Sequence, residues 1–348
     1  MEEKQLTLLR EQVQYNCHVA DARHGGDYGL CTYLLRMREY YRWECGLGFA
    51  EVPPRERVAE WIERREALWD GLDAAEFAPL TLAGERFDPF DSAAINHHLV
   101  PGGLVYSGGL GSAGKPHFFL GRLERQEVLG GHTLFVSGRE LARDLAAPPA
   151  MTLEGDIFVR RESLRRMLWE KLESWRWQRP DNALGRAFSS YAFDSDTEAA
   201  LDAMAENEID LLILHEQGEC AAGGYLGDRQ WQAMLSDFAF TPAELVARAV
   251  RDHLADCLST LPALLRRDPA SLHFYIGSLA GMRKELFPGL QAAYRLWHER
   301  GDASALACLA QEGGAHWRRL AERIMALHGA HGAAAAGQVM RLAEAGHL

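Results

Sequence analysis

The stretch Leu211-Leu-Ile-Leu-His-Glu-Gln-Gly-Glu219 places one imidazole and two carboxylates inside an apolar run with helical spacing. The stretch Asp252-His-Leu-Ala-Asp256 repeats this combination about ten helical turns further along the chain. Buried imidazole and carboxylate groups are costly unless they are paired, hydrogen-bonded or bound to a metal. We therefore expect two packed helices whose polar clusters meet, and we expect the chemistry of the protein there.

The helix that carries Asp252–Asp256 has a clear start signal. Thr241, Pro242 and Glu244 supply an N-cap, a first-turn proline and a capping-box carboxylate. The apolar pattern continues past Asp256, and Pro262 is expected to kink the helix because proline has no backbone N–H to donate. The first polar stretch belongs to a helix that is predicted to begin near residue 205.

The N-terminal part of the chain also reads as helix. Residues 3–24 carry apolar side chains at helical spacing, and Gly25-Gly26 is expected to end that helix. A second helix is predicted over about residues 27–44, with Leu30, Leu34, Met37 and Tyr41 on its inward face. The prolines 53 and 54 then break the chain before a third amphipathic helix.

Glycine and proline become frequent after residue 84, and the periodicity changes to that of short strands. The segments 117–124 and 132–137 flank Gly130-Gly131, which predicts a β-hairpin. Residues 104–107 and 157–159 are candidates for two more strands. We therefore predict a mainly α fold with a small β-rich insert, an α+β protein. The expected parts are an N-terminal helical unit (1–84), the insert (85–160), a C-terminal helical bundle (161–330) and an Ala/Gly-rich tail (331–348).

On a helix, residues four apart share a face, so His215 and Glu219 can reach one point together. His253 lies on the apolar stripe of the second helix, with Asp256 three residues further on. Histidine and carboxylate ligands suit zinc, iron or manganese. The four predicted ligands of a single divalent metal are His215, Glu219, His253 and Asp256. The alternative is a pair of metals that also shares Glu216 and Asp252.

The spacing His-Glu-x-x-Glu is similar to the His-Glu-x-x-His helix of zinc peptidases. That resemblance implies a general-base role for Glu216, which occupies the position of the catalytic glutamate. Glu219 stands where those enzymes carry a second histidine, so the resemblance does not extend to the full ligand set. The metal-binding prediction depends on the two helices together.

Three further groups of residues were candidates for chemistry. Cys17–His24 contains His18, Asp21 and Arg23, which we interpret as polar contacts between helices, with a shared pocket as the alternative. The loop Gly109–Pro116 matches two glycine-rich phosphate motifs, but Pro116 follows Lys115 and a strand is predicted next, so nucleotide binding is not expected. Arg139 and the arginines at 160, 161, 165 and 166 predict a salt-bridged surface, with anion binding by Arg139 or Arg160 as the alternative.

The net charge of −12 over 348 residues argues against a nucleic-acid partner, because binding to phosphates needs a surplus of Lys and Arg. No apolar run is long enough for a membrane span, and the first residues lack the pattern of a signal peptide. The six cysteines are dispersed without a CxxC pair. We therefore expect a cytoplasmic protein with an unidentified small-molecule or protein partner.

Several longer phrases have a familiar pattern, among them Arg38-Glu-Tyr-Tyr-Arg-Trp-Glu44, Phe87-Asp-Pro-Phe-Asp91 and Gly114-Lys-Pro-His-Phe-Phe-Leu120. Together with the two polar stretches, the chain resembles a full-length family of uncharacterised bacterial proteins, classed as a domain of unknown function. The resemblance implies no activity, cofactor or catalytic residue. The leading hypothesis from the residues is a metal-dependent enzyme, hydrolytic or oxidative. The alternative is a non-catalytic binding or scaffolding protein whose polar clusters are structural contacts.

Overall fold

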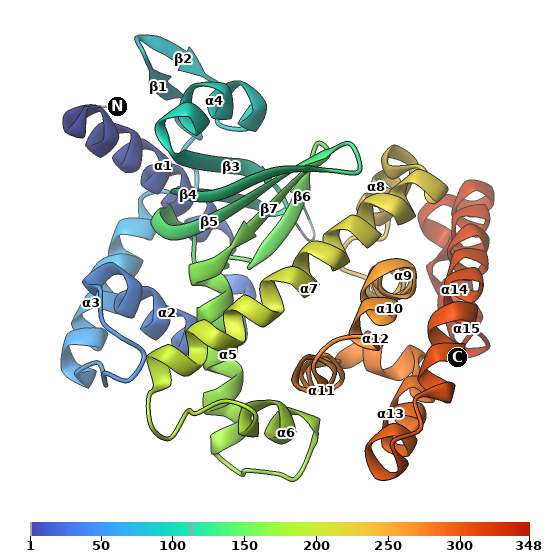
Figure 1. Cartoon of the computed structure of the whole chain (residues 1–348). Coiled ribbons are helices and arrows are strands. Elements are labelled where there is room, and N and C mark those ends of the chain that lie inside the picture. Colours follow the sequence, from blue (N-terminus) through green and yellow to red (C-terminus); the bar gives the residue numbers. More distant parts are fainter. Residues whose placement is uncertain (1, 112–113) are drawn as a thin grey trace. The chain divides into compact units, whose positions relative to one another are not determined.

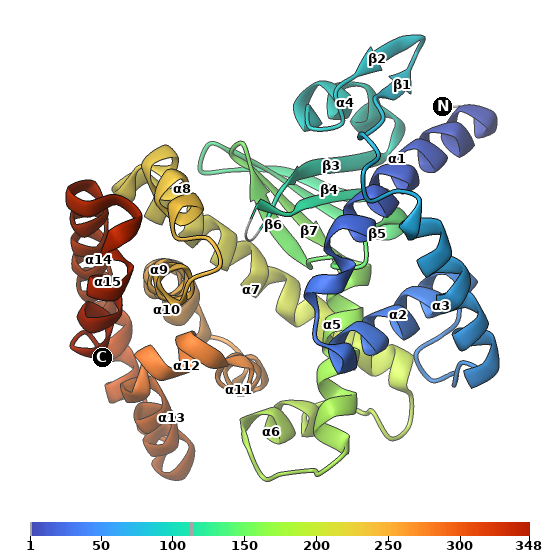
Figure 2. The ribbon, with the colours of Figure 1, turned by 180° about the vertical axis from the view of Figure 1, so that it is seen from behind.

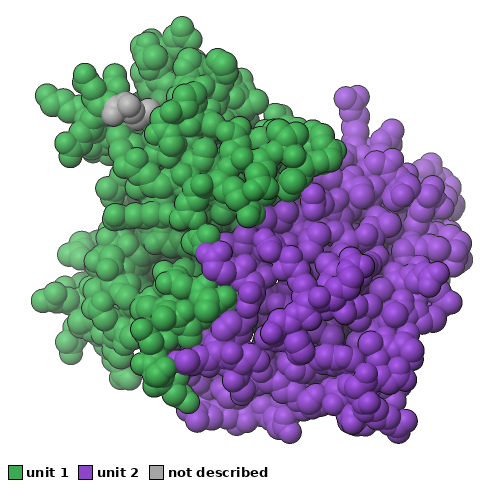
Figure 3. All heavy atoms as spheres, in the orientation of Figure 1, with its two compact units in different colours: residues 1–171, 194–205 green, residues 172–193, 206–348 purple. Residues whose placement is uncertain are grey.

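The computed structural model describes residues 2–111 and 114–348 (Figure 1). It is mainly helical with a smaller β region, which confirms the predicted α+β class. The chain divides into two compact units (Figure 3). The first unit comprises residues 1–171 and 194–205, and the second comprises residues 172–193 and 206–348.

The first unit combines helices with two small sheets. Its N-terminal helices are Glu3–His24 (α1), Leu30–Cys45 (α2) and Arg55–Asp70 (α3). A two-stranded sheet and a short helix follow: Leu80–Leu82 (β1), Glu85–Phe87 (β2) and Ser92–Leu99 (α4). The larger sheet consists of Leu104–Leu110 (β3), Pro116–Leu129 (β4), His132–Arg143 (β5), Ala150–Leu153 (β6) and Asp156–Arg160 (β7).

The larger sheet has the strand order β3-β4-β5-β7-β6. The pair β5 and β7 is parallel, and the other neighbouring strands are antiparallel. The predicted hairpin is confirmed: β4 and β5 are joined by Gly130 and Gly131, whose φ angles are 60° and 93°. Glycine adopts these left-handed conformations without the strain that a Cβ atom would cause.

Helix α1 packs against one face of the larger sheet (Figure 1). Val13 and Cys17 on the helix join Tyr106 and Leu120 of the sheet in one buried cluster. Because successive strand residues point to opposite faces, the neighbouring residues of β3 and β4 form a second apolar cluster on the other face. Both faces of the sheet are therefore buried over much of their area.

The inward face predicted for α2 is wrong at its start. Leu30 is 71% exposed and Leu34 is 45% exposed. The buried face consists of Met37, Tyr40 and Tyr41, which pack with the tryptophans of α3. Most of the apolar contact with α3 is made by the second half of α2, and Tyr33 of the first turn adds a hydrogen bond to Glu66 of α3, whereas Leu30 and Leu34 remain in solvent.

The second unit is helical throughout, and it shares Arg161–Arg176 (α5) and Thr197–Leu226 (α7) with the first unit. Helix α9 (Pro242–Ala255) packs against α14, α12 and α15, and Figure 2 shows α9 end-on. The other helices are Ala183–Ser189 (α6), Asp228–Asp237 (α8), Leu261–Leu264 (α10), Pro269–Ser278 (α11), Gly281–Leu286 (α12), Pro288–Arg300 (α13), Ser304–His331 (α14) and Ala336–Glu344 (α15).

Helix α9 begins at Pro242, as predicted, but the capping box is not formed. The Thr241 hydroxyl donates to the carbonyl of Phe238, and the Glu244 carboxylate accepts from the N–H of Phe240. A π-helical turn over Asp256–Thr260 follows α9 and precedes α10, which contains Pro262 near its start. π-helical turns are rare in proteins overall, and those that occur often lie at functional sites.

The Ala/Gly-rich end of the chain is more ordered than its composition indicates. After α14, a short 3-10 turn over Gly332–Ala335 leads into α15. Val339 is fully buried, and it belongs to the same apolar cluster as α9 and α14. A few apolar residues at helical spacing are therefore sufficient to fix this segment in the core.

The described helices differ in polarity along their length. Helix α7 is the longest at 30 residues, and charged side chains recur along it. No helix within residues 2–111 and 114–348 is long and apolar enough to cross a membrane.

All six cysteines lie within the described ranges, and all six are free thiols.

Candidate functional site

The two polar stretches are neighbours because Gly218 has no side chain where α7 meets α9. A Cβ atom on Gly218 would lie 2.4 Å from the carbonyl oxygen of Ala255 and 3.0 Å from its Cα atom. Real Cβ atoms do not approach backbone atoms this closely, so the separation of the two helices requires glycine at this position. The glycine of the first stretch therefore sets the distance between the candidate ligands.

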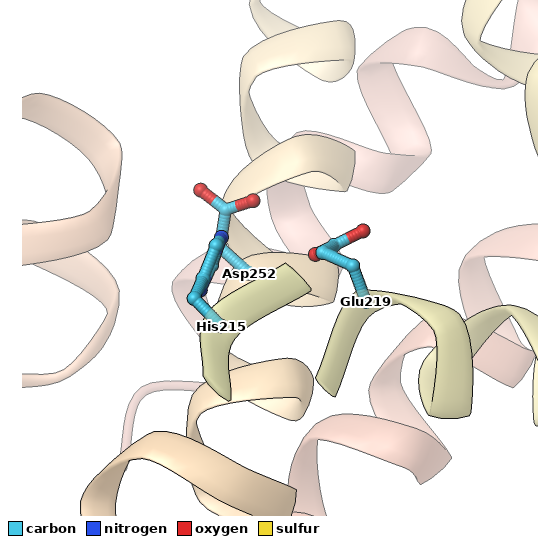
Figure 4. A group of neighbouring side chains, drawn as sticks. All are labelled: His215, Glu219 and Asp252. Carbon is cyan, nitrogen blue, oxygen red and sulfur yellow. The ribbon is translucent and has the colours of Figure 1, made fainter. Parts of the chain in front are cut away.

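Three side chains with metal-binding chemistry gather at this crossing. His215 and Glu219 project from α7 one turn apart, and Asp252 projects from α9 toward them (Figure 4). One ligand atom of each residue lies within 4.8 Å of the others. All three residues are partly exposed.

His215 is oriented by a buried carboxylate behind it. Its Nδ1 atom lies 2.8 Å from Oδ1 of Asp256, whose side chain is 1% exposed. The other Asp256 oxygen accepts from the hydroxyl of Tyr275 at 2.7 Å and from the guanidinium of Arg283. Metal-binding histidines usually donate their second ring N–H to a carboxylate in this way. The arrangement leaves Nε2 of His215 available for a ligand.

The charges of this pair reinforce each other. Burial alone would raise the pKa of Asp256, but Arg283 and His215 outweigh it and hold this pKa well below its ordinary value. Burial alone would lower the pKa of His215, but the Asp256 carboxylate raises it to about 10. At neutral pH, His215 is therefore an imidazolium, and a metal must displace its second proton.

Glu219 is held through one carboxylate oxygen, and its other oxygen has no hydrogen-bond partner among the described residues. Its Oε2 atom accepts from Nε of Arg251 at 2.6 Å. Its Oε1 atom is buried and has no hydrogen-bond partner among the described residues. Burial, with the negative charges of Asp252 and Glu216 nearby, outweighs Arg251 and raises the pKa of Glu219 to about 7. A cation at Oε1 would stabilise this carboxylate.

The structure places His253 in the apolar core rather than beside His215 and Glu219. It is fully buried, and its Nε2 donates to the carbonyl oxygen of Arg283 at 2.8 Å. Its ring stacks on Trp317 with a centroid distance of 4.9 Å. Burial and then the charge of Arg283 lower the pKa of His253 to about 4, so the imidazole is neutral.

The four ligands predicted from the sequence are thus not the set that the structure brings together. His215 and Glu219 belong to the observed group, whereas Asp256 supports His215 from behind. Asp252, which appeared in the two-metal alternative, takes the third place. Glu216 is 9% exposed, and its charge acts on Glu219. Its role as a general base stays a prediction.

Sequence reasoning missed the residues that hold this cluster. Tyr275 comes from α11, Arg283 from α12 and Arg251 from α9. Arg251 directly precedes Asp252 in the sequence, and this position beside the polar stretch could have indicated that it belongs to the cluster. Tyr275 and Arg283 had no such signal, because their contacts with Asp256 arise only when three separate helices pack together.

The candidates in the first unit have structural partners. His18 of α1 contacts Arg65 and Trp69 of α3, which confirms the predicted contact between helices. Asp21 instead accepts from the N–H of Leu145, and Arg23 donates to the carbonyl oxygens of residues 73 and 75.

The glycine-rich loop joins two antiparallel strands, β3 and β4. Ser112 and Ala113 of this loop lie outside the described residues. Lys115 forms an ion pair with Asp27 at 2.9 Å. The segment that follows the loop is β4, so the loop does not lead into the helix N-terminus that a phosphate-binding loop of the nucleotide motifs provides.

The salt-bridged surface predicted for the arginines is only partly correct. Arg161 pairs with Glu124 near the surface, but Arg160 is 1% exposed and forms two hydrogen bonds with Glu140. Arg166 pairs with Glu170, one helical turn further along α5. Strand β7 ends at Arg160 inside the unit, so the run of arginines begins in the core.

Two models of one protein family match the chain. The N-terminal domain of a family of unknown function (DUF6866) matches residues 8–160, and the C-terminal domain of the same family matches residues 165–346. No match was found among curated proteins or among solved structures. The family carries no stated activity, so it leaves the chemistry of the site open.

Proposed function

Because the chain belongs to the family of unknown function DUF6866, its activity must be inferred from the site itself, and we propose that the second unit carries the metal centre of a metal-dependent enzyme. The proposed ligands of one divalent ion are His215, Glu219 and Asp252. Three protein ligands with partial exposure leave a coordination position for water or substrate, as catalytic metal sites do. The observation that carries this proposal is the Oε1 atom of Glu219, which has no hydrogen-bond partner among the described residues.

The local charge supports a divalent cation. Four carboxylates, those of Glu216, Glu219, Asp252 and Asp256, lie in this cluster with the guanidinium groups of Arg251 and Arg283. The four carboxylates and two guanidinium groups leave a net charge of about −2 once His215 has lost its second ring proton and is neutral. The ligand atoms must approach one another by up to about 1.5 Å, because tetrahedral ligands about 2 Å from an ion lie only about 3.3 Å apart. Side-chain rotation can supply this movement.

A bound zinc, iron or manganese ion would supply Lewis-acid chemistry, or redox chemistry in the case of iron or manganese. Glu216 is proposed to accept a proton during the reaction, as the neighbouring carboxylate of the ligand helix. Asp256 and Arg283 are proposed to fix the orientation of His215. The free thiols support a reducing compartment, and we propose the cytoplasm.

A structural role is the second candidate. Asp256 has three partners within the protein, so the pair with His215 is also what a purely structural polar contact requires. The difference lies at Oε1 of Glu219, which such a contact would leave without a partner. A structural protein gains nothing from that open oxygen, whereas a metal site uses it.

Elemental analysis of the purified protein separates the two roles. We expect one zinc, iron or manganese ion per chain, and we expect His215→Ala and Asp252→Asn to lose it because each removes one of three ligands. The matched control is His273→Ala, since His273 lies in the same unit and bonds to Tyr294. If the wild-type protein is metal-free and also takes up no added metal, the metal centre is ruled out and the structural role is the remaining explanation.

A further inference from the structure

The first unit contains a cavity of about 440 Å³ that is lined mainly by charged side chains. Helix α1, the end of α2, strand β5 and the start of α5 contribute to its wall. The volume lies within the range of small-molecule sites in proteins. The cavity belongs entirely to the first unit, so it is a site separate from the proposed metal centre.

Arg143 is a buried guanidinium group without a close partner in this wall. The residue is 2% exposed, and its Nε atom has no hydrogen-bond partner among the described residues. Its other contacts are long: 3.4 Å to the carbonyl oxygen of Glu39 and 3.8 Å to the carboxylate of Glu140. A buried charge with such weak contacts is costly unless a ligand completes them.

The carboxylates of the wall form their short hydrogen bonds with groups other than Arg143. Glu140 forms two short hydrogen bonds with Arg160 and one with Ser163. Glu39 accepts from Arg38 and Arg42, at 2.8 and 3.0 Å. The remaining glutamates also have partners: Glu44 with Arg65, Glu162 with the N–H of residue 140, and Glu198 with Arg165.

Two more arginines in the wall form no hydrogen bond or salt bridge with a carboxylate among the described residues, although the charge of Arg139 acts on Glu162. Arg10 of α1 and Arg139 of β5 form no ion pair within residues 2–111 and 114–348. Together with Arg143 they give the cavity three guanidinium groups with unused donors. Guanidinium groups bind carboxylate and phosphate oxygens through paired N–H donors.

We infer that this cavity binds a small organic anion, with its carboxylate or phosphate group held by Arg143, Arg139 and Arg10. Trp43 and Phe49 also line the cavity, and they offer apolar contact to the body of such a ligand. The guanidinium carbon of Arg143 lies 5.0 Å from the Trp43 ring centroid, so the charged and aromatic parts of the site adjoin. The inference is independent of the proposed metal centre.

Calorimetric titration of the full chain with inorganic phosphate and, separately, with succinate tests the inference. We expect saturable binding of at least one probe, with one molecule per chain. A response to phosphate alone assigns a phosphate ligand, and a response to succinate alone assigns a carboxylate ligand. Arg139→Ala and Arg143→Met should each weaken the binding at least about tenfold, since each removes a charged hydrogen-bond donor pair.

The controls keep the test independent of folding. Arg122→Ala removes an exposed arginine of β4 in the same unit that does not line the cavity, and it should leave the affinity unchanged. His215→Ala should also leave it unchanged, which separates this site from the metal centre. If Arg143→Met fails to fold, the exposed positions Arg139 and Arg10 still decide the result. No saturable binding of either probe, or equal binding by the Arg10→Ala and Arg139→Ala variants and wild type, would overturn the inference.

Discussion

The Asp256→Asn substitution is expected to lower the free energy of unfolding by about 3 kcal/mol. The substitution removes the negative charge that faces both His215 and Arg283, while the hydrogen bond from Tyr275 can persist. Breaking a buried ion pair costs about 3–5 kcal/mol, and the lower end applies here because the side chains of Arg283 and His215 are 30% and 23% exposed. Urea-induced unfolding at pH 7 measures this change.

The same variant should bind a divalent metal about 10- to 100-fold more weakly, because His215 loses the carboxylate that orients it. The matched control is Asp237→Asn, which removes the carboxylate that pairs with His328. The Asp237 side chain is 55% exposed. An exposed pair of this kind contributes at most about 1 kcal/mol. Equal effects of the two substitutions on stability would contradict the account of the Asp256 cluster.

The Gly218→Ala substitution is expected to lower the free energy of unfolding by about 2 kcal/mol. Alanine is a better helix former than glycine by about 1 kcal/mol, so a solvent-exposed substitution would be stabilising. Here the added methyl group meets the backbone of Ala255, and backbone atoms cannot rotate away as a side chain would. Helices α7 and α9 must move apart, at a cost of about 3 kcal/mol for overpacking.

That movement also separates His215 and Glu219 from Asp252, so Gly218→Ala should weaken metal binding together with stability. Gly224→Ala is the matched control on the same helix, because a Cβ atom at Gly224 has nothing within 4 Å. It should be neutral or stabilising by up to about 1 kcal/mol and should retain the metal. A stabilised Gly218→Ala variant with unchanged metal affinity would show that the helices do not need this close approach.

Local signals predicted most of the fold. The 3.6-residue periodicity identified the helices, and the Gly130-Gly131 pair identified the hairpin, because both reflect interactions between residues close in sequence. The exposure of Leu30 and the burial of Val339 were not predictable in this way. Each depends on whether a helix distant in sequence covers the apolar face, and the local sequence pattern does not determine this.

The site shows the same limit more sharply. The spacing of His215 and Glu219 correctly indicated a shared helix face, because that geometry is local. His253 is also a histidine on an apolar helix face, yet it lies in the core, where the carbonyl oxygen of Arg283 accepts its hydrogen bond. Burial could be predicted from the pattern, whereas the partner of each buried group depends on the packing of α9, α11 and α12.

Zinc titration by calorimetry, at pH 7 in buffers of different ionisation enthalpy, tests the metal centre most directly. We expect one zinc ion per chain and the release of between about one and two protons, because the pKa of His215 is about 10 and that of Glu219 is about 7. His215→Ala should abolish the binding, and His273→Ala should retain it. No zinc binding, or binding that releases no protons and survives His215→Ala, would contradict the account.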